Sequence, residues 1–122
     1  MAKILIVDDS LTIRQQVSAT LVSGGFEVVE AVDGQDALSQ LSSGTGFSLV
    51  ICDVNMPRLN GLDMLEKMRA VAGLVDMPVL MLTTEGQPEY VKRAKTLGAK
   101  GWMVKPVRPD LLLSAAKKLT AS

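Results

Sequence analysis

Short apolar runs alternate along this chain with segments whose apolar residues recur at helical spacing. The predicted strands cover residues 3–7, 26–31, 47–52, 78–83 and 101–104, and the first of them is a continuous apolar run. Continuous runs of this length are typical of strands that are buried on both faces of a parallel sheet. The helical segments cover residues 11–23, 34–41, 62–71 and 88–97, and a last helix begins near residue 109. Such alternation predicts an α/β fold of the (βα)5 type, a doubly wound five-stranded parallel sheet with helices on both faces.

Length and composition narrow the class of protein. The 122 residues suit one domain over residues 1–122, and 48% hydrophobic against 21% charged residues excludes a disordered chain. No apolar run is long enough for a membrane helix or a secretory signal, so we expect a cytoplasmic protein. One cysteine and no histidine exclude disulfides within the chain, a Ser-His-Asp triad and a phosphohistidine of its own.

Charge is balanced overall but unevenly distributed. Thirteen basic residues match thirteen acidic ones, so the net charge favours neither nucleic acid nor an anionic membrane as a partner. Residues 1–61, however, hold seven acidic residues against three basic ones, a net charge of −4. We therefore expect the first half of the chain to bind a cation.

Polar side chains follow the predicted strands at their carboxyl ends, where doubly wound sheets bind ligands. These residues are Asp8, Asp9, Asp53, Thr83 and Lys105. One aspartate at a strand end ordinarily caps a helix or a turn, but three meet if the first and third strands are neighbours. Their mutual repulsion calls for a cation, and a few carboxylates completed by water suit Mg²⁺ better than Ca²⁺. Lys105 supplies a second positive charge.

Four segments carry a resemblance to a known family. They are ILIVDDS at the first strand, ICDVNMPRLNG at the third, VLMLTTE at the fourth and GAKGWMVKP at the fifth. In this order and spacing the chain resembles bacterial two-component response-regulator receiver domains, most closely the single-domain chemotaxis regulators of the CheY type. The resemblance covers nearly the whole chain and implies the flavodoxin-like strand order 2-1-3-4-5 and a cis bond before Pro106.

The resemblance also implies a role for each polar residue at the strand ends. Asp53 would accept a phosphoryl group. Mg²⁺ would be held by Asp8, Asp9, Asp53 and the backbone carbonyl of Asn55. The phosphoryl-binding and switch residues would be Thr83, Lys105 and Trp102, and the residues that modulate dephosphorylation would be Asn55 and Glu85.

Trp102 departs from the family pattern, which usually has a tyrosine at this position of the fifth strand. That aromatic ring fills the space left by the threonine when the switch is on. An indole is larger and offers a donor but no acceptor. Two interpretations stay open: Trp102 is the switch aromatic, or it packs over the edge of the sheet.

The expected function is a phosphorylation-activated switch with no separate substrate, and hence not an enzyme in the ordinary sense. A histidine kinase would supply the phosphoryl group, a phosphatase would remove it, and the protein would be a monomer. A separate target, such as the flagellar motor switch, would bind through the fourth helix, fifth strand and fifth helix. The loop Gly86-Gln87-Pro88 departs from the adjacent lysines of enteric CheY proteins. The alternative is a phosphate shuttle or sink in a multistep phosphorelay.

Three other classes fit the residues less well. A flavodoxin-like electron carrier needs a phosphate pocket where Asp8 and Asp9 would repel phosphate. A phosphatase of the haloacid dehalogenase type needs a general acid two residues after its nucleophile, and that position holds Asn55. A docking module with a dead site would not need the complete set of strand-end residues.

Overall fold

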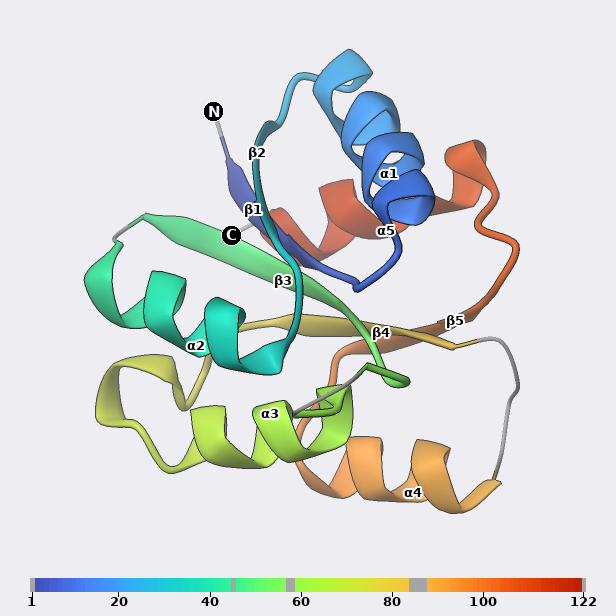
Figure 1. The fold of residues 1–122 in the computed structure, drawn as a ribbon. Coiled ribbons are helices and arrows are strands. Elements are labelled where there is room, and N and C mark those ends of the chain that lie inside the picture. The colour runs from blue at the N-terminus through green and yellow to red at the C-terminus, as the bar shows by residue number, and fades with distance from the viewer. Residues whose placement is uncertain (1, 45, 57–58, 84–87, 122) are drawn as a thin grey trace.

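Five parallel strands form the central layer of the computed structural model, which describes residues 2–44, 46–56, 59–83 and 88–121. The strands are β1 (Lys3–Val7), β2 (Glu27–Ala31), β3 (Phe47–Asp53), β4 (Val79–Thr83) and β5 (Gly101–Val104). The helices are α1 (Leu11–Ser23), α2 (Gly34–Ser43), α3 (Gly61–Arg69), α4 (Pro88–Thr96) and α5 (Pro109–Thr120). The sheet has the order β2-β1-β3-β4-β5, which confirms the predicted fold (Figure 1).

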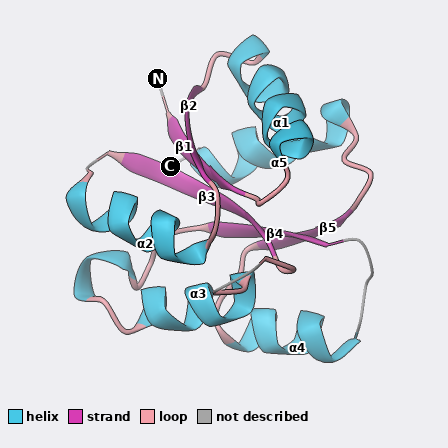
Figure 2. Ribbon diagram, viewed as in Figure 1, coloured by secondary structure: helices cyan, strands magenta, loops and turns pink. Residues whose placement is uncertain are grey.

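Helices cover both faces of the sheet (Figure 2). On one face, α1 and α5 bury Val17, Leu21 and Leu112 against Ile4 and other even-numbered residues of β1. On the other face, α2, α3 and α4 pack over the odd-numbered residues of the same strand. The inner strands are apolar on both faces because each face has its own layer of helices, as the continuous apolar runs predicted.

The helix boundaries follow local hydrogen bonds. The side chains of Ser10, Asp33 and Asn60 each accept a hydrogen bond from the backbone N–H three residues later, so each caps the start of a helix. With these caps, the helices lie within a few residues of their predicted ranges.

The end of α3 lies two residues before its predicted position. The apolar pattern predicted a helix as far as Val71, but α3 ends at Arg69 and a 3-10 helix, η1 (Ala72–Leu74), follows it. The Arg69 guanidinium donates hydrogen bonds of 2.7–3.2 Å to four carbonyl oxygens on two segments. Those carbonyls belong to Leu74, Met77, Leu97 and Gly98. Arg69 thus ties the segment that follows α3 to the segment that follows α4.

Because all strands are parallel, their carboxyl ends meet at one rim of the sheet and the helices lead the chain back to the other end. The carbonyl of Ala2 accepts a hydrogen bond of 2.9 Å from Glu27 at the start of β2. Near the other terminus, Leu119 of α5 lies beside Gly101 at the start of β5. Both ends of the described chain therefore lie away from the rim (Figure 1). Among the described residues, no helix has the length and apolar character needed to span a bilayer.

Candidate functional site

Three carboxylates meet at the rim, as the sequence predicted. Asp8 and Asp9 follow β1, and Asp53 ends the neighbouring strand β3. One oxygen from each carboxylate lies within 4.8 Å of the other two. Asp8 and Asp53 are buried, whereas Asp9 is exposed at the mouth of the cluster.

Lys105 reaches this cluster from β5, on the far side of β4. Its Nζ atom lies 3.0 Å from Oδ2 of Asp8 and 3.4 Å from Oδ2 of Asp53. Burial lowers the pKa of Lys105, but the hydrogen bonds and negative charges of the two aspartates outweigh it, so the pKa is raised overall. The ammonium group therefore stays charged and bridges two acids that would otherwise repel each other.

The Asp53 carboxylate lies in surroundings that disfavour its ionised form. Burial and the charge of Asp8 raise its pKa, while Lys105 and the Asn55 backbone N–H oppose that shift only in part. Its Oδ1 atom is buried and has no hydrogen-bond partner among the described residues. A buried charged oxygen without a partner is costly and is characteristic of a position that a ligand completes.

The donor set suits a hard divalent cation. Carboxylate oxygens from three residues converge, and one of them lacks a partner among the described residues. Oxygen ligands of this kind are those that Mg²⁺ prefers in proteins. The residues present therefore fit a bound magnesium ion.

Thr83 and Trp102 lie on the same face of the sheet. Thr83 ends β4 and is buried, and its carbonyl accepts a 2.7 Å hydrogen bond from the Lys105 backbone N–H. Met81 and Thr83 are two residues apart on β4, so their side chains project on the same face of the sheet. Trp102 pairs with Met81 in the register of β4 and β5, and it therefore projects on this face as well. The indole is partly buried against the core beneath α4, and its Nε1 atom has no hydrogen-bond partner among the described residues. This placement agrees with both interpretations of Trp102.

The structure says less about the predicted roles of Asn55 and Glu85. Asn55 is exposed two residues after Asp53, and its backbone N–H bonds the Asp53 carboxylate. Its predicted role as a carbonyl ligand stays a prediction. Glu85 lies outside the described residues.

Cys52 is not a reactive thiol. It is fully buried next to Asp53, and its Sγ lies 3.2 Å from the Asp53 carbonyl oxygen. Burial, then the charges of Asp53 and Asp8, raises the pKa of the thiol well above its ordinary value. The thiol therefore stays protonated and acts as a small core residue.

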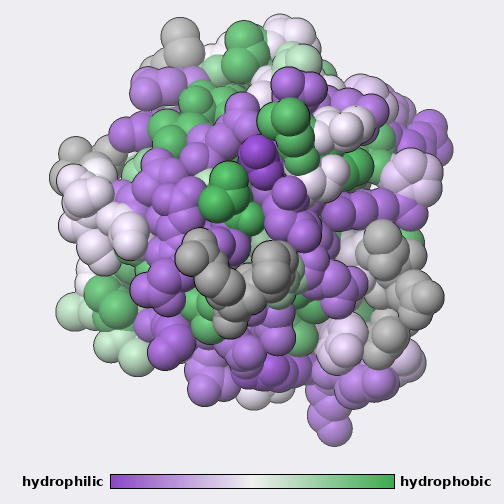
Figure 3. Space-filling model, in the orientation of Figure 1, coloured by the Kyte–Doolittle hydropathy of each residue, from purple (hydrophilic) through white to green (hydrophobic). Residues whose placement is uncertain are grey.

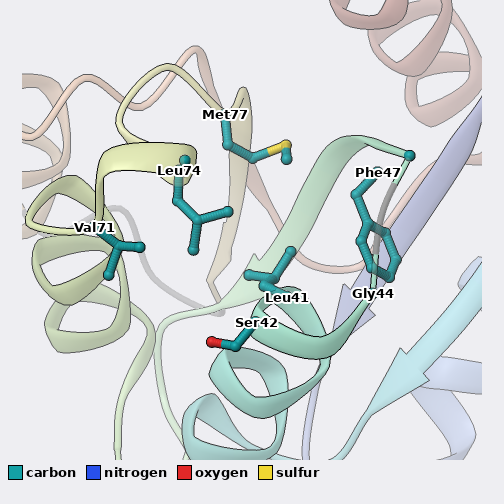
Figure 4. A pocket seen from close by; sticks show the side chains of 9 residues that line it. Leu41, Ser42, Gly44, Phe47, Val71, Leu74 and Met77 are labelled. Atoms are coloured by element: carbon teal, nitrogen blue, oxygen red, sulfur yellow. The ribbon is translucent and has the colours of Figure 1, made fainter.

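A hollow of about 520 Å³ opens at the opposite end of the sheet (Figure 4). It lies between the end of α2, the start of β3 and the segment that leads from α3 to β4. The residues that line it are Leu41, Ser42, Gly44, Gly46, Phe47, Val71, Gly73, Leu74 and Met77. None of these described residues is titratable, so they offer no acid or base to this hollow, and the charged groups lie at the rim.

Arg14 contacts the site although the sequence analysis did not single it out. Its Nη1 donates a 2.7 Å hydrogen bond to the Asp8 carbonyl oxygen. An arginine in the first turn of an amphipathic helix ordinarily faces solvent, so the sequence carried no signal for this contact.

The surface around the site is mainly polar. Hydrophilic residues cover most of the face in Figure 3, and the apolar residues form small separate groups. The described residues on this face therefore form no broad apolar surface that would compete with the rim as a site.

The comparisons with known proteins agree with this geometry. The sequence pattern that defines the response regulator receiver domain matches residues 4–117. The chain therefore belongs to the response regulator receiver domain family, and it is of the CheY-like kind.

Three relatives illustrate the likeness. Chemotaxis protein CheY1 of Helicobacter pylori is 39% identical over 111 residues, 90% of each chain. A CheY homolog of Campylobacter jejuni is 40% identical over 90% of this chain and 85% of its own. The structure of chemotaxis protein CheY4 of Vibrio cholerae superposes with a TM-score of 0.92 at 44% identity and covers 98% of both chains.

Proposed function

We propose that this protein is a cytoplasmic signalling switch that accepts a phosphoryl group on Asp53. The observation that carries this proposal is the Asp53 carboxylate, whose buried Oδ1 lacks a partner among the described residues while Oδ2 faces Lys105. The donor would be a phosphohistidine on a separate histidine kinase, because this chain has no histidine. The P–N bond of the donor breaks as a P–O bond to Asp53 forms, and the histidine nitrogen keeps the electron pair.

The charged groups around Asp53 suit this transfer. We assign Asp8, Asp9, Asp53 and the Asn55 carbonyl as the groups that hold Mg²⁺. Magnesium supplies positive charge that neutralises phosphoryl oxygens. Lys105 supplies a second such charge, since its raised pKa keeps it protonated. Lys105 is therefore placed to leave Asp8 and Asp53 and pair with a phosphoryl oxygen.

We expect Thr83 to respond to the negative charge of a phosphoryl group on Asp53. Its hydroxyl would bond a phosphoryl oxygen, and Trp102 on the same face would then repack. Support comes from the shared face and from the indole nitrogen, which has an unused donor in the present arrangement among the described residues. Asn55 and Glu85 would modulate hydrolysis of the acyl phosphate, with or without a phosphatase.

The output would be binding of a separate protein through α4, β5 and α5. A hollow of about 260 Å³ on this face is lined by Trp102, Met103, Val104, Pro106, Arg108 and Leu111. Val104 and Leu111 are about half exposed, so apolar surface is available there. The relatives are named chemotaxis proteins, which makes the flagellar motor switch the first target to test.

Labelling with acetyl phosphate and Mg²⁺ tests the central step. Mass spectrometry of the intact protein should show one added phosphoryl group, and the Asp53→Asn variant should gain none. Omission of Mg²⁺ should suppress the label. A label on another residue, or equal labelling of Asp53→Asn, would contradict the proposal. Transfer of the phosphoryl group from Asp53 to a histidine of a second protein would favour the shuttle alternative.

A further inference from the structure

Every polar atom of Asp8 has a hydrogen-bond partner. Its backbone N–H donates to the Ala31 carbonyl at 3.2 Å. Its Oδ1 accepts from the Ser10 backbone N–H at 2.9 Å, and its Oδ2 accepts from Lys105 Nζ at 3.0 Å. The fourth partner is Arg14, whose Nη1 lies 2.7 Å from the Asp8 carbonyl oxygen. Asp8 is thus held at its backbone as firmly as at its carboxylate.

Arg14 is itself fixed. Its Nε donates to Oε1 of Glu30 on β2 at 3.2 Å, and the other Glu30 oxygen accepts from Ser18 Oγ at 3.0 Å. The Arg14 side chain is only 11% exposed, whereas that of Glu30 is 40% exposed. A planar guanidinium can donate to a carbonyl and a carboxylate at once in a fixed relative direction. Arg14 therefore ties the backbone after β1 to the neighbouring strand.

The bonded carbonyl belongs to the peptide that joins Asp8 to Asp9. Because a peptide is planar, the direction of its carbonyl fixes the direction of the Asp9 N–H and hence the start of Asp9. No hydrogen bond among the described residues reaches the Asp9 carboxylate, which is exposed. Its place in the acidic cluster therefore depends on the backbone.

We propose that Arg14 is a positioning residue for the metal site: by holding the Asp8 carbonyl, it fixes the Asp8–Asp9 peptide and so aims the Asp9 carboxylate into the cluster. This inference rests on the proposed function, in which the cluster takes Mg²⁺. Arg14 would touch neither the ion nor the phosphoryl group.

Simple electrostatics and a positioning role predict opposite changes in Mg²⁺ affinity when Arg14 is removed. Arg14 carries a positive charge close to the acidic cluster, so its removal should tighten cation binding if charge alone mattered. Loss of positioning should weaken binding instead, and loss of groups that orient metal ligands typically costs about 10- to 100-fold in affinity. The direction in which the Mg²⁺ affinity changes therefore distinguishes a positioning role of Arg14 from an effect of its charge alone.

Calorimetric titration with Mg²⁺ of the unphosphorylated protein at fixed ionic strength tests the proposal. We expect Arg14→Met to weaken binding by about 10-fold or more. Arg14→Lys, which keeps the charge and one donor for the Asp8 carbonyl, should recover most of the loss. Arg93→Met is the matched control, because Arg93 is a paired arginine that bonds Asp63 and Glu66 away from the cluster. It should leave the affinity unchanged.

A second measurement distinguishes a specific effect of Arg14 on the metal site from a general disturbance of the fold. In Arg14→Met, the labelling of Asp53 by acetyl phosphate should need a higher Mg²⁺ concentration to reach half of its maximal rate. The maximal rate at saturating Mg²⁺ should equal that of the wild type. Should that variant fail to fold, Glu30→Gln carries the test, because it loosens Arg14 without removing it and should weaken Mg²⁺ binding by a smaller factor.

The outcomes separate this inference from the function on which it rests. Equal or tighter Mg²⁺ binding by Arg14→Met, or by Glu30→Gln where that variant carries the test, would overturn the positioning role and leave the phosphorylation proposal standing. Wild-type protein that binds no Mg²⁺ would overturn both.

Discussion

Asp53 is bonded at one carboxylate oxygen and is left without a partner at the other among the described residues. The raised pKa follows from this environment, first from burial and then from the charge of Asp8. The site therefore stores unfavourable electrostatic energy while it lacks a cation, and a ligand that supplies positive charge relieves it.

The same shift makes stability depend on pH. Because the pKa of Asp53 is higher in the folded protein than its ordinary value of 3.8, the folded state binds this proton more tightly. The resulting stabilisation is complete below pH 3.8 and is lost as the pH rises through the raised pKa. Without Mg²⁺ at neutral pH, Asp53→Asn should therefore be more stable than wild type by about 1 kcal/mol or more. Urea unfolding in EDTA over a pH series measures this difference.

The advantage of Asp53→Asn should shrink as the pH falls toward 3.8. A difference that stays constant with pH would show that the ionised carboxylate is not its source.

At the residue scale the sequence predicted the carboxylates and Lys105 because each lies at the end of a strand or within two residues after it. The strand pattern places all of them at one rim. It could not predict that Arg14 bonds the Asp8 carbonyl, because that contact depends on how a long side chain crosses from α1. The indole of Trp102 was likewise undetermined, since a strand position fixes its face but not its rotamer.

At the scale of elements, α3 begins directly against the end of β3. The Gly61 N–H donates to the Val54 carbonyl at 3.0 Å, and Asn60 caps the helix. A β-carbon on Gly61 would collide with the Asp53 carbonyl oxygen and approach Met81. The glycine therefore allows the helix to start close to the end of β3.

Substitution of this glycine should harm both stability and the site. We expect Gly61→Ala to lower the free energy of unfolding by about 1 to 3 kcal/mol, because backbone must move to admit the methyl group. Since the displaced backbone is that of Asp53, labelling by acetyl phosphate should also slow.

Gly73→Ala is the matched control for this substitution, because a β-carbon there would meet nothing within 4 Å. It should change neither the free energy of unfolding nor the labelling rate. Equal behaviour of the two alanine variants in urea unfolding would refute the steric argument.

The elements themselves were largely predictable, and the exceptions have a physical cause. The apolar residues located all five strands because helices cover both faces of the sheet. The end of α3 was placed two residues too late, because the chain leaves the helix through the hydrogen bonds of Ala70 and Val71 to the carbonyls three residues earlier. Apolar spacing does not distinguish such a final turn from a continuing helix.

At the scale of the whole molecule, the sheet order joins charges that are distant in sequence. The acidic first half contributes Asp8, Asp9 and Asp53, and the basic second half contributes Lys105 across β4. Composition predicted that the first half binds a cation. The order β2-β1-β3-β4-β5 explains how its acids and the lysine share one rim.

Magnesium should therefore stabilise the whole fold. At about 100 times its dissociation constant, an ion that binds only the folded protein adds about 2.7 kcal/mol, or roughly 10 °C in Tm for a domain of this size. Calorimetric or fluorescence melting with and without Mg²⁺ measures the shift. Asp53→Asn should show a smaller shift, and sodium chloride at equal ionic strength should show none. An equal rise in Tm with sodium chloride would assign the effect to general screening.

The return of both chain ends to the side away from the rim has a practical consequence. Strands of about five residues separate the two sides by roughly 16 Å. A fluorescent tag or a linker to a sensor chip, attached next to Ala2 or Leu119, would therefore leave the rim accessible. Immobilised protein could then be exposed in turn to Mg²⁺ and to acetyl phosphate, without the attachment point shielding the acidic cluster.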